Sequence, residues 1–195
     1  MSMRKVYAAV VTCAVMTCAV LAVPCAASAQ MAGETRLGLG SPIGPGDVAA
    51  YFAIPPSGRG LPPGAGTAAQ GREIYARDCA ACHGEQLQGN PQAGIGGDRL
   101  IGGRGSLATK TPVKTVESYW PYATTLFDYV KRAMPFTAPG SLSDDDTYAV
   151  VAFILAEAKI IAPADTMNAK SLPQVKMPNR DGFVPDPRPE LSLYR

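Results

Sequence analysis

Three segments of the chain place apolar residues at the three- and four-residue spacing of an amphipathic α-helix. The first predicted helix begins after Thr67, a residue type that caps helix N-termini, and runs to about Asp78. Its apolar side carries Gly71, Ile74 and Tyr75. The pattern therefore predicts a helix with one buried side.

Two further helices are predicted in the second half of the chain. One runs from Tyr122 to Ala133 and ends before Pro135, because proline cannot continue a helix. The other begins after Ser143, a favoured N-cap, and ends near Ala158. Three aspartates in its first turn suit the positive end of the helix dipole, which explains them more simply than a cation site. Its apolar stripe consists of Tyr148, Val151, Ala152, Ile154 and Leu155.

Composition divides the chain into four segments. Residues 1–29 have the features of an export signal, and residues 67–160 contain all the predicted helices. Residues 30–66 are rich in Gly and Pro and residues 161–195 in Pro, so we expect extended N- and C-terminal arms there. No long alternating stretch favours a sheet. The predicted fold class is all-α, with three to five short helices wrapped by irregular chain.

The first 29 residues resemble a cleavable secretory signal peptide. A positively charged start precedes an apolar run from Val6 to Val23, and Ala27-Ser28-Ala29 supplies the small-residue cleavage pattern before Gln30. The alternative is an uncleaved anchor, because the apolar run is just long enough to span a bilayer. We predict export to the periplasm and no membrane attachment in the mature form.

Charge and cysteine content change after the signal is removed. The chain has 18 Lys and Arg against 16 Asp and Glu, and loss of Arg4 and Lys5 leaves a net charge of zero. A neutral chain lacks the basic face that nucleic-acid binding requires. Of the five cysteines, the mature chain keeps only Cys79 and Cys82, which are too close together to staple distant parts of a domain.

Cys79-Ala80-Ala81-Cys82-His83 has the sequence pattern of c-type haem attachment. In that pattern each thiol bonds one vinyl group of the porphyrin, and the histidine ligates the iron. A zinc site would need four ligands, and the mature chain has no further Cys or His. A redox pair does not need His83 and lacks its usual βαβ context. The sequence predicts one covalent haem c.

The second axial ligand is predicted to be Met134. The chain has no second histidine, and methionine is a soft thioether that stabilises ferrous iron. Met31 lies at the new terminus, and Met167 and Met177 lie in the Pro-rich arm. Met134 lies in the turn between the last two predicted helices, where its side chain can reach over a haem face. The alternatives are a methionine that only fills the core and a five-coordinate iron.

Three further contacts are expected around the haem. His83 should donate its other ring N–H to a backbone carbonyl of the glycine-rich loop 84–105, which contains Pro91. Trp120 could wall the haem pocket or donate to a propionate, or could be an ordinary core aromatic. Arg104 could pair with a propionate or could be a solvated surface arginine.

Across residues 67–160 the order of helix, haem motif, loop, Met-Pro turn and acidic-capped last helix resembles class I cytochrome c. The resemblance implies the cytochrome c fold, with short helices around one haem. It also implies a close crossing of the first and last helices, where Gly71 and Tyr75 would meet Ala152 and its neighbours.

A narrower resemblance, to the SoxD-like cytochrome subunits of periplasmic sulfur and sulfite dehydrogenases, covers nearly the whole mature chain. The motifs that carry it are Leu37-Gly38-Leu39-Gly40, Gly60-Leu61-Pro62-Pro63-Gly64, Val116-Glu117-Ser118-Tyr119-Trp120-Pro121-Tyr122-Ala123, Arg132-Ala133-Met134-Pro135-Phe136, Pro139-Gly140-Ser141-Leu142 and Lys176-Met177-Pro178-Asn179-Arg180-Asp181-Gly182-Phe183. Some members of that group carry two haems, and this chain has one attachment motif.

The resemblance implies an electron-transfer subunit that performs no bond chemistry. It would accept electrons from a molybdenum-cofactor dehydrogenase subunit that oxidises sulfite or sulfane sulfur, and pass them to a downstream cytochrome or oxidase. The terminal arms would then lie across the partner or wrap their own domain. Two other functions stay open: a free periplasmic carrier for another dehydrogenase, and a five-coordinate haem that binds a gas or reacts with peroxide.

Overall fold

The computed structural model describes residues 53–91 and 97–185. The predicted signal peptide, most of the predicted N-terminal arm and the last ten residues of the chain lie outside the described residues. Within the described ranges, no helix has both the length and the apolarity needed to cross a membrane.

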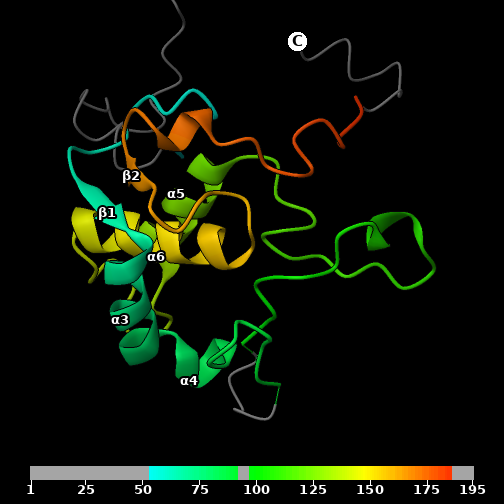
Figure 1. Cartoon of the computed structure of the whole chain (residues 1–195), viewed down its shortest axis with the longest axis horizontal. Helices are drawn as coiled ribbons and strands as arrows, with labels where there is room; N and C mark the ends of the chain where they lie inside the picture. The colour runs from blue at the N-terminus through cyan, green and yellow to red at the C-terminus, as the bar shows by residue number, and fades with distance from the viewer. Residues whose placement is uncertain (1–52, 92–96, 186–195) are drawn as a thin grey trace, which may run out of the picture. The chain divides into compact units, whose positions relative to one another are not determined.

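The described residues are mostly helical, and the predicted class is confirmed (Figure 1). The helices are α3 (Ala68–Asp78), α4 (Ala80–His83), α5 (Ala123–Ala133) and α6 (Asp144–Glu157), with 3₁₀ turns η1 (Ser106–Ala108) and η2 (Leu172–Gln174). The three predicted helices therefore occur within about one residue of their expected bounds. The sequence did not predict α4, or the small antiparallel sheet of β1 (Ala65–Thr67) and β2 (Thr166–Asn168).

The predicted N-caps form as hydrogen-bonded caps. Thr67 and Gln70 make a capping box at the start of α3, and the Ser143 hydroxyl accepts from the Asp146 N–H at 3.1 Å at the start of α6. The aspartates of α6 also hold neighbouring chain, since an Asp145 carboxylate oxygen accepts from the Ala65 N–H at 2.7 Å. The acidic turn thus fixes both the helix and the strand beside it.

The close crossing of α3 and α6 organises the core. Gly71 lies against α6 so closely that a Cβ there would overlap the Ala149 carbonyl and crowd Phe153. One turn later, the Tyr75 and Phe153 rings lie with their centroids 5.1 Å apart. The implied crossing is confirmed, and Gly71 meets α6 at Ala149, one turn before the expected Ala152, which is itself fully buried.

The described parts of both predicted arms pack onto this core. On the N-terminal side, the Pro62 carbonyl accepts from the Tyr148 hydroxyl at 2.9 Å, and β1 pairs with β2. On the C-terminal side, four side chains are buried in the same cluster: Met167, Leu172, Val175 and Met177. The sequence left two roles open for the arms, contact with a partner or packing on their own domain. These described residues of each arm pack on their own domain.

Replacing Gly71 with alanine tests the crossing. Helix propensity alone would raise stability by about 1 kcal/mol, but the added methyl must displace the α6 backbone, so we expect a net loss of about 1–2 kcal/mol. Urea unfolding measures the free energy. Ala76→Gly, at an exposed position of α3, is the control for propensity. A Gly71→Ala protein that gains stability would show that the two helices do not meet as described.

Candidate haem-binding site

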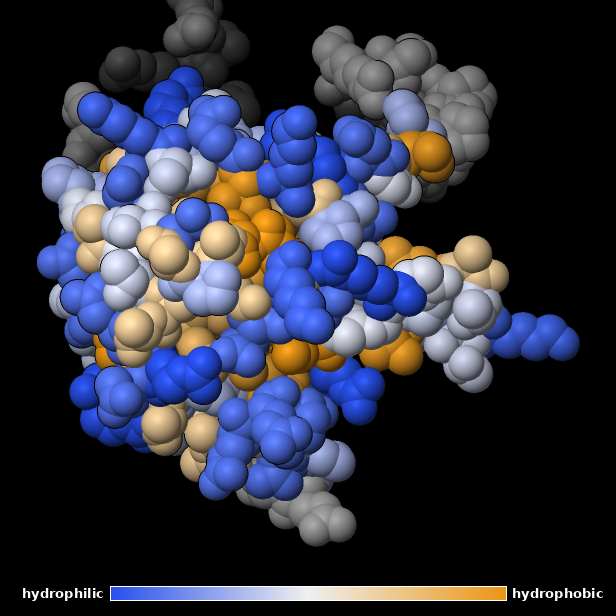
Figure 2. Space-filling model, in the orientation of Figure 1, coloured by the Kyte–Doolittle hydropathy of each residue, from blue (hydrophilic) through white to orange (hydrophobic). Residues whose placement is uncertain are grey.

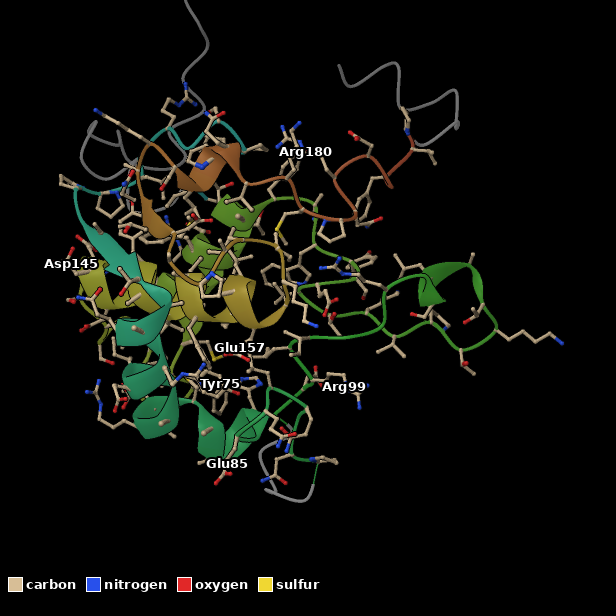
Figure 3. The ribbon with its side chains drawn as sticks, viewed as in Figure 1. Tyr75, Glu85, Arg99, Asp145, Glu157 and Arg180 are labelled. Atoms are coloured by element: carbon tan, nitrogen blue, oxygen red, sulfur yellow. The ribbon has the colours of Figure 1, made fainter. Side chains whose placement is uncertain are left out.

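A cavity of about 400 Å³ opens between the helices and the two chain segments 97–100 and 114–120. Its walls come from all four helices, and Figure 3 labels Tyr75 of α3 and Arg99 of the loop after α4, which line it from different elements. Most of the cavity lining is apolar. Six of the apolar lining residues also belong to the hydrophobic core or pack against it: Leu100, Val116, Leu126, Val130, Val150 and Ile154. A cavity of this size and polarity suits a mostly apolar organic ligand.

Cys79, Cys82 and His83 all line this cavity. Cys79 is both the C-cap of α3 and the N-cap of α4. The Cys79 carbonyl accepts from the Cys82 N–H at 3.1 Å and from the His83 N–H at 2.9 Å. Because residues three and four apart lie on one side of a helical turn, α4 directs the two thiols and the imidazole to the same wall. The structure thus brings the predicted attachment residues together.

His83 is oriented by the loop that follows it. Its Nδ1 lies 2.7 Å from the Asp98 carbonyl oxygen, and since a carbonyl only accepts, Nδ1 carries the proton. The predicted bond to a backbone carbonyl of the glycine-rich loop is confirmed. The Gly89 N–H donates to the His83 carbonyl at 2.7 Å, and Gly97 lies against the Cys82 carbonyl with no room for a side chain. With Nδ1 committed to this hydrogen bond, Nε2 is the ring nitrogen that could ligate a metal.

Tyr75 ties α3 to the turn after His83. Its hydroxyl donates to the Gly84 carbonyl at 2.7 Å in a buried setting. Burial raises the pKa of Tyr75 well above its ordinary value, with a smaller contribution from Cys79. The phenol therefore stays protonated and keeps its hydrogen for the Gly84 carbonyl at any physiological pH.

The thiol of Cys79 is not poised as a redox nucleophile. Burial, with smaller effects of Asp78 and Cys82, raises its pKa to about 11. Reactive Cys-x-x-Cys pairs have a depressed pKa that exposes a thiolate at neutral pH. Cys79 would stay protonated there, which favours a structural, bond-forming role over disulfide exchange.

Met134 and Trp120 also line the cavity. Met134 ends α5, where its N–H donates to the Val130 carbonyl at 3.1 Å, and its side chain is partly buried against the core. Trp120 packs edge-on against Tyr129 with the ring centroids 5.6 Å apart. Met134 and Trp120 therefore line the same cavity as His83, although they come from other parts of the chain.

Arg104 is not among the side chains that line the cavity. Its Nε pairs with Glu117 at 2.5 Å and its Nη2 donates to the Ala158 carbonyl at 2.6 Å. Arg99 and Lys114 line the cavity instead, and sequence reasoning missed both. Arg99 and Lys114 belong to the two segments that border the cavity, and the sequence alone does not show that these segments meet.

Comparisons with known proteins place these features in a family. Residues 66–154 match the family model described as cytochrome c oxidase, cbb3-type, subunit III. The chain is 31% identical over 121 residues to the thiosulfate dehydrogenase of Stutzerimonas stutzeri (strain A1501), covering 60% of this chain and 35% of that protein. The chain thus spans about a third of the length of this curated relative.

Among solved structures, the chain is similar to the crystal structure of the sulfane dehydrogenase SoxCD from Paracoccus pantotrophus. The TM-score is 0.70 and the sequence identity 41%, over 82% of this chain and 78% of that one. The family match includes the cysteine-histidine motif and Met134 within its range.

Tyr75→Phe and Tyr148→Phe form a matched pair that tests the support of this site. Each removes a hydroxyl that donates to a backbone carbonyl, to Gly84 or to Pro62, so each should lower the free energy of unfolding by about 1–2 kcal/mol. Hydrogen exchange read by mass spectrometry should accelerate at residues 82–89 only in Tyr75→Phe. Equal acceleration there in both variants would show that Tyr75 does not hold the turn.

Proposed function

The chain belongs to the cytochrome c family and is related to the cytochrome subunits of thiosulfate and sulfane dehydrogenases, and we propose that it is the periplasmic single-haem subunit of such an enzyme. The observation that carries the proposal is the convergence of Cys79, Cys82, His83 and Met134 on one mostly apolar cavity. In this role the chain transfers electrons and its partner performs the bond chemistry.

The donor set fits one haem c. Cys79 and Cys82 line the cavity and would hold the group through thioether bonds to its two vinyl groups. His83 would use its Nε2, because its Nδ1 N–H is committed to the Asp98 carbonyl. Met134 offers a thioether from the end of α5. Nitrogen and sulfur ligands of these types are those of electron-transferring cytochromes c.

The bound haem supplies one iron that takes up and releases a single electron. The surrounding side chains decide how easily it does so. The thioether of Met134 would favour the ferrous state of the iron, and the apolar side chains of the cavity would exclude water and lower the local dielectric. Arg99 and Lys114 carry positive charge at the cavity wall, where they would neutralise the two propionates.

The electron donor is proposed to be a molybdenum-cofactor dehydrogenase subunit that oxidises sulfite, thiosulfate or sulfane sulfur. The similarity to SoxCD and to a thiosulfate dehydrogenase supports a sulfur-oxidising partner. The acceptor is proposed to be a second cytochrome or an oxidase. The predicted signal peptide supports a periplasmic site for both transfers.

A free periplasmic carrier is the second candidate. The observation that favours it is the packing of residues 53–66 and 161–178 onto their own domain, which leaves fewer of the arm residues available to a partner. A carrier would be monomeric and would exchange electrons with several unrelated donors. A subunit would be reduced efficiently by one enzyme alone.

Met134→Leu tests the second axial ligand. The thioether is lost at nearly constant volume, so the oxidised protein should lose its weak near-infrared sulfur-to-iron charge-transfer band, and the reduced protein should bind carbon monoxide. Met177→Leu is the control, because Met177 is buried in the same core but does not line the cavity. A band that survives in Met134→Leu and disappears in Met177→Leu would reassign the ligand.

Co-purification from the native host tests the partner. The cytochrome should be recovered with a molybdenum-containing protein, and sulfite or thiosulfate should reduce its haem only when that protein is present. Stopped-flow absorbance at the reduced haem bands measures the rate. Reduction at equal rates by unrelated dehydrogenases, with a monomeric cytochrome, would establish the free carrier instead.

A further inference from the structure

Met134 begins the connection from α5 to α6, residues 134–143, which we call the methionine loop. Its first four residues, 134–137, line the haem cavity. The chain is then exposed over residues 138–141, and Leu142 is buried in the core. On the face shown in Figure 2, apolar side chains gather near the middle of the helical body and hydrophilic ones surround them. The far half of the loop has only Leu142 to anchor it among such side chains, so burial alone does not fix its position.

Lys131 joins the far end of the methionine loop to α5. Its side chain leaves the last turn of α5, and its Nζ donates to the Leu142 carbonyl at 2.7 Å. The same Nζ lies 2.8 Å from a carboxylate oxygen of Asp144, the first residue of α6. A Cβ at Gly140 would lie 4.0 Å from the Lys131 carbonyl oxygen, so the returning chain also comes close to the α5 backbone. Lys131 thus closes the loop three residues before Met134.

Few other bonds act on the methionine loop. Within it, the Ala138 N–H donates to the Pro135 carbonyl at 2.9 Å, and the Ser141 N–H donates to the Ala138 carbonyl at 3.3 Å. Apart from Lys131, no side chain in the described ranges 53–91 and 97–185 forms a hydrogen bond or ion pair with residues 135–142. The bond from Lys131 is of a strong kind, because the ammonium donor is charged and partly buried.

The charge of Lys131 also suits its place between the two helices. It lies in the last turn of α5, where the helix dipole favours a cation. On the other side it meets the acidic first turn of α6, where the carboxylates of Asp144, Asp145 and Asp146 lie. The contact therefore links the end of the helix that leads to Met134 with the start of the helix that organises the core.

We propose that Lys131 is a positioning residue for Met134, because it keeps the methionine loop closed and so holds the thioether over the iron. The inference rests on the proposed haem and its ligands, and it adds the residue that decides how firmly the second axial ligand is held. An external ligand can reach the iron on this side only while the loop is open, so its apparent affinity reports the population of the open state. Lys131 keeps that population low and protects the iron from small molecules that would ligate it.

Titration of the oxidised, full-length, haem-loaded protein with imidazole tests the proposal. Imidazole must displace the Met134 thioether to bind the iron, and the shift of the haem absorption bands measures its binding. Lys131→Ala removes both contacts and keeps a good helix former, so the apparent affinity for imidazole should rise about tenfold. Lys131→Arg keeps the charge and the donors, and its affinity should stay within about threefold of the native protein.

Arg72→Ala is the matched control. It changes the net charge equally and also removes an ion pair between two helices, because Arg72 of α3 lies 2.5 Å from Glu157 of α6. Arg72 does not line the haem cavity and forms no ion pair with the methionine loop. Its affinity for imidazole should stay within about twofold of the native protein. An equal rise in Arg72→Ala and Lys131→Ala would overturn the proposal, since it would reflect a general loss of stability.

Hydrogen exchange read by mass spectrometry measures the opening of the loop itself. Exchange at residues 134–143 should accelerate in Lys131→Ala and not in Arg72→Ala. If exchange accelerates while the imidazole affinity stays native, Lys131 holds the loop but not the ligand, and the proposal is wrong.

The near-infrared sulfur-to-iron band of the native oxidised protein separates the two possible failures. If the band is absent, Met134 is not a ligand, and the positioning role of Lys131 is lost together with the proposed ligand set. If the band is present and Lys131→Ala binds imidazole like the native protein, the ligand set stands and only the role of Lys131 fails.

Discussion

The crossing of α3 over α6 is the contact on which the site depends. Gly71 allows the α3 backbone to touch α6 at Ala149, and α3 runs directly into the turn that carries the two cysteines and the histidine. The same α6 also packs against α5, whose last turn leads to Met134. Both proposed axial ligands are therefore positioned relative to one helix, although they are about fifty residues apart in the sequence.

Around that crossing, the irregular chain is held by backbone carbonyls that accept from side chains. Tyr75 donates to the carbonyl that follows the histidine, and His83 donates to Asp98. Backbone bonds from Leu100 to Leu87 and from Val116 to Leu100 then join the loop to the segment that borders the cavity. Buried polar groups without partners are costly, so such a network selects one arrangement of the described parts of this glycine-rich loop.

Features set by neighbouring residues were predictable, and those set by distant contacts were not. The caps at Thr67 and Ser143 depend on residues within one turn, so the sequence located them correctly. The partners of Arg104 were not predictable, because only the folded chain shows that its guanidinium lies near the Glu117 carboxylate. The pairing of β1 with β2 was missed for the same reason, since about a hundred residues separate two strands of three residues each.

The proposed function requires one iron held between His83 Nε2 and the Met134 thioether in a covalently attached porphyrin. X-ray absorption at the iron edge of the oxidised, full-length protein measures this most directly, because it distinguishes sulfur from nitrogen ligands. The account predicts five nitrogen neighbours and one sulfur neighbour. Iron with no sulfur neighbour, or a purified protein that holds no iron, would contradict it.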